Sequence, residues 1–176
     1  SIELVTLSNN DHDWTRFVTG FPNANIFHSS EMNEVLSLSD GFEPIPLFAV
    51  HGGEVVACAF PVIVESDLPL PGKLRRRLIL YSSPLAVDSE LGVQGLNLLL
   101  DRIAQISKRS ALFAEIRNSD SYANGFLEAF NKWEYCPREN YLVDLTLGEN
   151  ELLSRLSSRT RKKTRRAKLH GCTVRE

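Results

Sequence analysis

The chain has 176 residues, 43% of them hydrophobic, which is enough for one domain with a sizeable core, or for one domain and part of a second. The net charge of −2 is unevenly distributed: residues 1–154 carry 11 basic and 21 acidic residues (−10), whereas residues 155–176 carry 9 and 1 (+8). No apolar run approaches ~18 residues and residues 1–20 lack an apolar signal-peptide stretch, so we expect neither a membrane-spanning helix nor a signal peptide.

The first part of the chain predicts a strand, two helices and a β-hairpin. Gly52 and Gly53 separate two apolar, β-branched segments, a pattern typical of a hairpin turn. Ser29 has the position of a helix N-cap. The predicted elements are a strand at 2–7, helices at 11–22 and 25–42, and single strands at 44–50 and 54–64.

The rest of the chain alternates strands with helices. The segment 111–117 has few polar breaks, which favours a central strand covered on both faces. The hairpin implies antiparallel pairing, and the strand–helix–strand unit around 91–108 implies a parallel pair. The predicted elements are strands at 74–83, 111–117, 140–147 and 172–176, and helices at 91–108, 121–133 and 149–169. We therefore expect an α/β (α+β) fold, a mixed sheet with helices on both faces.

Three segments of the sequence resemble one family of transferases. Trp14 and Phe17, followed by NANIFHSSEMNEV, are similar to the family's early pattern of an Asn-rich turn, Phe, Gln or His, Ser and a helix. GEVVACAFPV is similar to its hairpin, and residues 140–174 are similar to the junction between its two lobes, where an extended segment ending in Asp-Leu leads into a Lys/Arg-rich helix. The family is the FemAB-like transferases, built from two lobes of the GNAT (acyl-CoA N-acyltransferase-like) fold.

The resemblance implies a division of the chain into residues 1–147, a GNAT-like lobe, and residues 148–176, the helix and strand that open a second, missing lobe. Members of this family transfer an aminoacyl group from a charged transfer RNA to a nucleotide-linked sugar-peptide precursor. The implied partners are therefore aminoacyl-tRNA or a nucleotide-linked precursor. Either the missing lobe or self-association would cover the exposed surface.

The sequence departs from the family pattern at two places. Met32 stands where an aromatic residue is common, and Leu36 and Ser37 stand where peptidoglycan-directed members carry a phosphate-binding lysine. The pyrophosphate-binding loop of acetyl-CoA-dependent enzymes is also missing, because Gly92 and Gly95 have the wrong spacing. We therefore expect no CoA cofactor.

The basic segment supplies the candidate binding residues. On a single helix spanning 149–169, leucines, threonines and Ala167 form one arc and cations fill the remainder. Arginine offers a planar fork suited to phosphate oxygens. The candidate phosphate-binding residues are Arg161, Arg165 and Arg166, which match the family motif most regularly, together with Arg159 and Lys162. A solvated helix face is the alternative interpretation.

Other charged and polar residues permit more than one interpretation. Residues 75–77, three arginines in a predicted strand, indicate protection of a sheet edge, with a phosphate contact as the alternative. Glu115 and Arg117 share one side of a strand, so they form a structural ion pair or line a cleft. His28 beside Ser29 indicates helix capping, not a nucleophile. The loop 82–86 lies where this fold binds ligands.

Neither cysteines nor carboxylates form a recognisable catalytic or metal-binding pattern. Cys58, Cys136 and Cys172 lack the spacing of a zinc site or a disulfide framework, so we expect no metal, reduced thiols and a cytoplasmic protein. No paired carboxylates or activated nucleophile are evident, and no catalytic residue is assigned.

These observations lead to two functional hypotheses. The first is the N-terminal lobe of a FemAB-like transferase that moves an aminoacyl or acyl group onto an amine of a cell-envelope or polysaccharide precursor, as in peptidoglycan synthesis. Such a lobe would be inactive by itself. The alternative is a small non-enzymatic protein whose basic C-terminal arm binds RNA or another polyanion.

Overall fold

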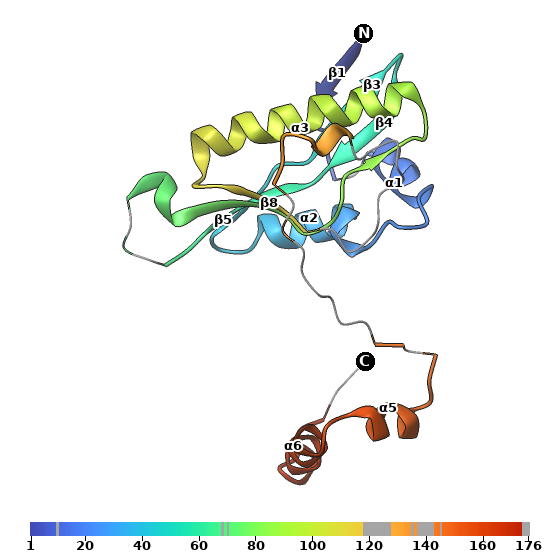
Figure 1. Ribbon diagram of the computed structural model, residues 1–176, viewed down its shortest axis with the longest axis vertical. Helices are drawn as coiled ribbons and strands as arrows, with labels where there is room; N and C mark the ends of the chain where they lie inside the picture. Colours follow the sequence, from blue (N-terminus) through green and yellow to red (C-terminus); the bar gives the residue numbers. More distant parts are fainter. Residues whose placement is uncertain are drawn as a thin grey trace. The chain divides into compact units, whose positions relative to one another are not determined.

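The computed structural model describes residues 1–9, 11–67, 69, 71–117, 128–134, 136, 143–144 and 146–173. The chain divides into two compact units, Ser1–Cys136 and Pro137–Glu176. The boundary predicted between residues 147 and 148 thus falls inside the second unit. Each unit is described separately (Figure 1).

The first unit contains two four-stranded sheets and three α-helices among its described residues. One sheet has the strand order β1-β3-β4-β7 and the other β2-β5-β6-β8. The helices are α1 (His12–Thr19), α2 (Ser30–Ser37) and α3 (Glu90–Ser110), with short 3-10 turns η1 (Ile26–His28), η2 (Gly72–Arg75) and η3 (Glu128–Phe130). The strands are β1 (Ile2–Val5), β2 (Phe42–Pro44), β3 (Leu47–His51), β4 (Glu54–Ala59), β5 (Pro61–Glu65), β6 (Arg76–Leu80), β7 (Leu85–Ala86) and β8 (Ala114–Ile116).

The predicted hairpin is present, but each of its two strands is divided between the sheets. Gly52 and Gly53 adopt φ of 59° and 86° in the turn, a conformation that glycine adopts without steric cost. The ladder of β3 with β4 ends at the pair Leu47↔Ala59, and β2 pairs with β5 in the other sheet. Single strands at 44–50 and 54–64 were therefore wrong predictions. Pro46 and Pro61 lie at the breaks, and a proline cannot donate to a ladder.

The core lies on both faces of the sheet formed by β3 and β4. Ala49, Ala57 and Ala59 contact Leu99 and Ile103 of α3 in one buried cluster. The alternate strand residues point the other way, and Phe48, Cys58 and Phe60 pack with Trp14 of α1 in a second cluster. Figure 1 shows α3 on one side of the strands and α1 and α2 on the other. The prediction of helices on both faces is confirmed.

Two other strand predictions were wrong. Arg75 belongs to η2, and β6 begins at Arg76 and lies between β5 and β8, so the arginines do not protect a sheet edge. Arg76 pairs with Glu43 and Glu65 instead. The segment 111–117 contains only the three-residue strand β8, which is half buried and, among the described residues, pairs in parallel with β6 alone.

The second unit contains two helices where one long helix was predicted. They are α5 (Glu149–Arg155) and α6 (Ser158–Leu169), and Leu156 between them has an extended conformation. The Ser157 side chain accepts a hydrogen bond from the Thr160 backbone N–H, which begins a new helix. The predicted helix at 121–133 and the strands at 140–147 and 172–176 lie largely outside the described residues.

The described residues also limit membrane and metal interactions. None of their helices is long and apolar enough to cross a bilayer. Within the same residues, no group of three His, Cys, Asp or Glu side chains is arranged to hold a metal ion.

Candidate binding site between the sheets

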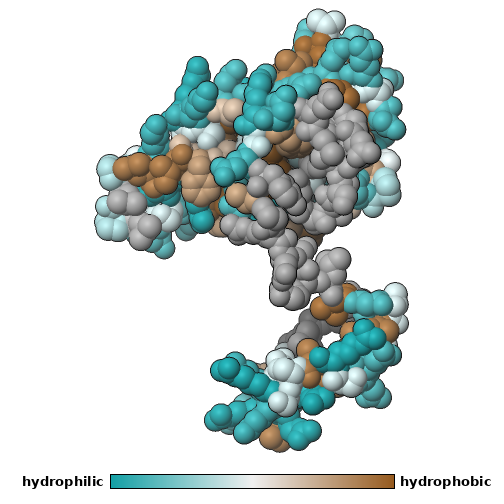
Figure 2. Space-filling model, in the orientation of Figure 1, coloured by the Kyte–Doolittle hydropathy of each residue, from teal (hydrophilic) through white to brown (hydrophobic). Residues whose placement is uncertain are grey.

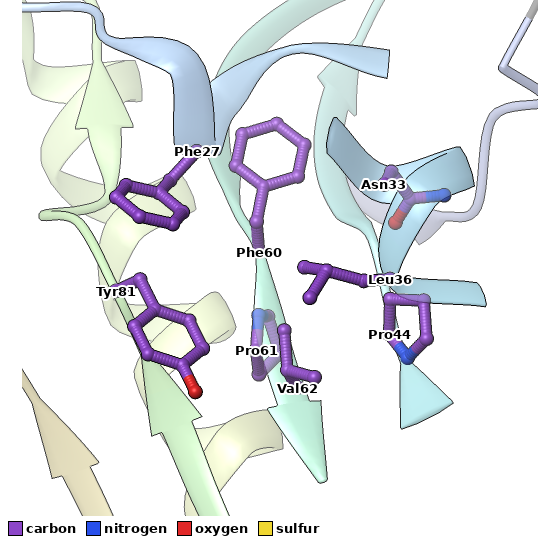
Figure 3. Close-up of a pocket in the computed structure, with 8 residues that line it drawn as sticks. All are labelled: Phe27, Asn33, Leu36, Pro44, Phe60, Pro61, Val62 and Tyr81. Atoms are coloured by element: carbon purple, nitrogen blue, oxygen red, sulfur yellow. The ribbon is translucent and has the colours of Figure 1, made fainter. Parts of the chain in front are cut away.

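The candidate site is a hollow where the two sheets of the first unit diverge. After β6, residues 81–84 leave their sheet, and β7 joins the other one by pairing with β4. Aromatic and apolar side chains from η1, α2 and three strand ends surround the hollow (Figure 3). The lining residues are Phe27, Asn33, Leu36, Pro44, Phe60, Pro61, Val62 and Tyr81.

Two aromatic rings and a guanidinium group form one wall of the site. Phe27 stacks on Tyr81 with ring centroids 5.2 Å apart and an interplanar angle of 20°. The guanidinium carbon of Arg117 lies 5.3 Å from the centroid of the Tyr81 ring, within the range of a cation–π interaction. Figure 3 shows the rings of Phe27 and Tyr81 next to each other at the open side of the hollow.

An ion pair fixes the guanidinium group beside the tyrosine. Arg117 Nε donates to Glu115 Oε1 at 2.9 Å, and the backbone N–H of Arg117 donates to the Leu80 carbonyl. The Arg117 side chain is 47% exposed, so solvent screens this pair and its contribution to stability is small. Both interpretations of the pair therefore hold: it is structural, and it lies at the mouth of the site.

His28 holds the aromatic wall in position. Its ring is buried, and Nδ1 accepts from the Asn25 backbone N–H at 3.0 Å in a capping box. Nε2 lies 2.8 Å from the Ser83 carbonyl oxygen and must therefore carry the proton, which is the neutral tautomer. The indole N–H of Trp14 donates to the His28 carbonyl at 2.8 Å. The prediction that His28 caps a helix is confirmed.

The geometry suits a ligand that lies across the rim. The enclosed part of the hollow is about 10 Å³, close to the least volume that holds one water molecule. A planar or sugar ring could stack at Tyr81, and the exposed guanidinium of Arg117 could pair with an anionic group. Ser82 and Ser83, from the loop expected to line the cleft, are buried instead.

The start of α3 does not fit the pyrophosphate of CoA. The Ser89 hydroxyl already accepts from the Gly92 N–H at 3.2 Å. A Cβ atom on Gly92 would lie 1.9 Å from the Val87 carbonyl oxygen, so this glycine permits close packing of the helix on the preceding segment. Asp88 and Glu90 add negative charge at the same place. We derive no chemical step through this cofactor.

The predicted phosphate-binding residues lie in α6 and are all exposed. Arg159, Lys162 and Arg166 recur at helical spacing on one face, whereas Arg161 and Arg165 lie on another. Arg161 Nη1 donates to the Ser154 carbonyl at 3.2 Å and so stabilises the end of α5. The other four make no ion pair within the part of the chain that the structure describes. Phosphate binding by these residues stays a prediction.

Phe27 and Tyr81 are the site residues that the sequence did not reveal. Their contact joins positions 54 residues apart, and neither belongs to a recognisable motif. The available signal was position: Tyr81 immediately precedes the loop 82–86, which was expected at the ligand cleft. The wrong side chains of that region were singled out because a serine pair attracts attention in a sequence.

The comparisons with known proteins show the fold. No protein-family model and no curated protein matches the chain. A ribosomal-protein-alanine N-acetyltransferase from Brucella melitensis biovar Abortus 2308 is 14% identical with a TM-score of 0.55, covering 82% of this chain and 100% of its own. An aminoglycoside antibiotic 6'-N-acetyltransferase from Acinetobacter baumannii is 15% identical with a TM-score of 0.53, covering 82% and 98%.

A third solved structure has a different extent of overlap. FemX is 21% identical to this chain with a TM-score of 0.55, and the match covers 93% of this chain and 42% of FemX. At these identities the likeness concerns the arrangement of the backbone. With its two sheets and its helices on both faces, the chain has the GNAT fold that the sequence predicted.

Proposed function

We propose that the chain forms the N-terminal GNAT-like lobe of a FemAB-like transferase. The enzyme would move an aminoacyl or acyl group onto an amine of a cell-envelope or polysaccharide precursor on the cytoplasmic side. In this assignment the hollow between the sheets holds the acceptor, with its ring at Tyr81 and an anionic group at Arg117.

The extent of the FemX match carries this proposal. A match to 93% of 176 residues is about 164 residues, more than the 136 residues of the first unit. It must therefore include α5 and the first part of α6. A match to 82% is about 144 residues, so the two acetyltransferases can end soon after the first unit. The basic segment thus has a counterpart in FemX.

The geometry at α3 supports a donor other than acetyl-CoA. In this chain Gly92 serves packing, and Asp88 and Glu90 would repel a pyrophosphate. A charged transfer RNA is a polyanion and would instead use the exposed cations of α6, such as Arg165 and Arg166.

The test is calorimetric titration of the 176-residue chain with a nucleotide-linked sugar-peptide and, separately, with acetyl-CoA. We expect saturable binding of the first ligand and none of the second. Tyr81→Leu and Arg117→Gln should each weaken binding about tenfold, because each removes one contact of the site. Arg102→Gln, an exposed change on α3, is the matched control. Saturable binding of acetyl-CoA alone would contradict the proposal.

A second candidate function is a basic arm that binds RNA. The observation that favours it is the exposure of the α6 cations, with Arg159, Lys162, Arg165 and Arg166 making no ion pair among the described residues. Equal affinity of the chain for transfer RNA and for unrelated RNA, together with no affinity for the nucleotide-linked sugar-peptide, would favour this arm over the transferase.

A further inference from the structure

One end of the first unit combines cations with exposed apolar side chains. It is formed by η2, the start of β6 and the turn that follows α3, and two hydrogen bonds join these segments: Leu112 N–H to the Arg76 carbonyl at 2.8 Å, and Leu78 N–H to the Phe113 carbonyl at 3.0 Å. We call it the basic end. Its exposed residues are Lys73, Leu74, Arg75, Arg77, Lys108, Arg109, Leu112 and Phe113.

The apolar side chains of the basic end have no cover within the described residues. Leu74, Leu112 and Phe113 are 45%, 55% and 44% exposed. In Figure 1 the C-terminal end of α3 and the turn η2 lie at the same end of the unit, and Figure 2 shows hydrophobic side chains gathered there, beside hydrophilic ones. A cluster of large apolar residues beside cations marks an interaction surface.

The charge of this end differs from that of its unit. Residues 1–136 carry 10 basic and 17 acidic residues, a net charge of −7, yet six of the ten cations lie here or in the adjoining Arg76. Arg75 and Arg76 are paired with Glu65. The other four, Lys73, Arg77, Lys108 and Arg109, have no ion pair among the described residues, and the exposed Asp67 is the carboxylate that precedes η2 in the chain.

We propose that the basic end docks the first unit on an anionic membrane surface. Unpaired lysines and arginines attract anionic lipid headgroups, and leucine and phenylalanine side chains enter the boundary between headgroups and acyl chains. The three apolar residues lie on two segments joined by hydrogen bonds, so they can enter one surface together. This inference is independent of the proposed transferase activity.

Other occupants suit the basic end less well. Nucleic acid offers phosphates for the cations but nothing apolar for Leu74 and Leu112, and a platform for stacked bases needs more aromatic rings than Phe113 alone. A second copy of the chain, placed by two-fold symmetry, would bring unpaired cations against the same cations. An anionic lipid surface satisfies both kinds of side chain.

The test measures co-sedimentation of the full chain with vesicles of phosphatidylcholine, alone or with one third phosphatidylglycerol. The cations of α6 would bind the same vesicles, so Arg159, Lys162, Lys163, Arg165 and Arg166 are first replaced by Gln to give the parent chain. We expect this parent to bind the anionic vesicles only. Lys108→Gln with Arg109→Gln should weaken binding about 25-fold, at about fivefold per cation.

Apolar variants and a local probe complete the test. Leu112→Ser with Phe113→Ser should weaken binding at least about tenfold, and Leu98→Ser with Arg16→Gln, exposed elsewhere on the unit, should not. In a parent that also carries Cys136→Ser and Cys172→Ser, an environment-sensitive dye on Leu112→Cys should shift to the blue on anionic vesicles, and one on Leu98→Cys should not. This readout does not depend on a variant that could unfold.

Three results would overturn the proposal. The first is a parent chain that binds no anionic vesicle. The second is a dye at residue 112 whose emission does not change. The third is a parent that self-associates or binds RNA through this end without binding lipid.

Discussion

Helix α1 in the first unit has 8 residues and buries Trp14 and Val18, whereas α6 in the second unit has 12 residues and buries none of them. The shorter helix is held by a core that also contains Phe48 and Phe60. The longer one is held by local contacts, such as the Ser157 cap and the hydrogen bond from Arg161 to Ser154. Isolated helices of this length are marginal in water, so the two units should respond very differently to similar substitutions.

The largest expected difference is in the reactivity of the cysteine thiols. Burial raises the pKa of the Cys58 thiol, whereas Cys136 and Cys172 are exposed. We expect a disulfide reagent to modify two thiols quickly and Cys58 at least about a thousandfold more slowly, because Cys58 requires unfolding of the core. Titration with and without denaturant checks the count of two and then three. Three fast thiols would mean that the core opens readily.

The same thiol gives the first unit a dependence on pH. Because burial keeps Cys58 protonated in the folded state, its contribution to stability is complete below about pH 9, the ordinary pKa of a thiol, and decreases as the pH rises further.

The next largest effect compares two leucine substitutions. Leu99→Ala removes a fully buried side chain and should lower the free energy of unfolding by about 2–5 kcal/mol. Leu169→Ala, at a residue that is 81% exposed in α6, should change it by less than about 0.5 kcal/mol. Both tryptophans lie in residues 1–136, so their fluorescence during urea unfolding measures the first unit. Equal effects of the two changes would contradict the assigned burial.

A third comparison uses two glycines. Gly92→Ala places a methyl group against the Val87 carbonyl and should cost about 1–3 kcal/mol, because backbone has to move. Gly148→Ala meets no atom within 4 Å and should be nearly neutral. Thermal unfolding followed by tryptophan fluorescence separates the two. An unaffected melting temperature for Gly92→Ala would show that α3 packs less closely on its neighbours.

The smallest expected effect is confined to the second unit. Ser157→Ala removes the cap of α6 and should destabilise that helix by about 1 kcal/mol. Without a core to transmit the change, amide hydrogen exchange should accelerate within α6 only. Ser158→Ala, at the next position, is the control. A lower melting temperature of the first unit would instead reveal coupling between the units.

The sequence predicted the elements whose signals are local. The hairpin followed from Gly52 and Gly53, and α3 followed from its apolar spacing and ended two residues beyond the predicted Lys108. Ser29 was recognised as an N-cap and forms that hydrogen bond with Met32. In each case the information lies within one turn of chain.

The features that the sequence did not predict depend on distant or competing interactions. Apolar character continues through Phe60, yet the strand changes its pairing partner there, which only the other strands determine. The break at Ser157 was missed because the cation pattern continued through it, although a serine after Leu156 is a capping signal. The contact of Phe27 with Tyr81 depends on the placement of η1 by His28.

The parallel pairing of β6 with β8 has a consequence for the order of folding. The turn at Gly52 and Gly53 closes the β3–β4 hairpin within a few residues, whereas the pair Leu78↔Ala114 joins positions 36 residues apart with α3 between them. The entropy lost in closing a chain segment increases with its length, so the hairpin should form early and the parallel pair late. Arg117 then reaches Tyr81 only in the last step, and pulse-labelling during refolding should protect the Leu80–Arg117 backbone bond after the hairpin.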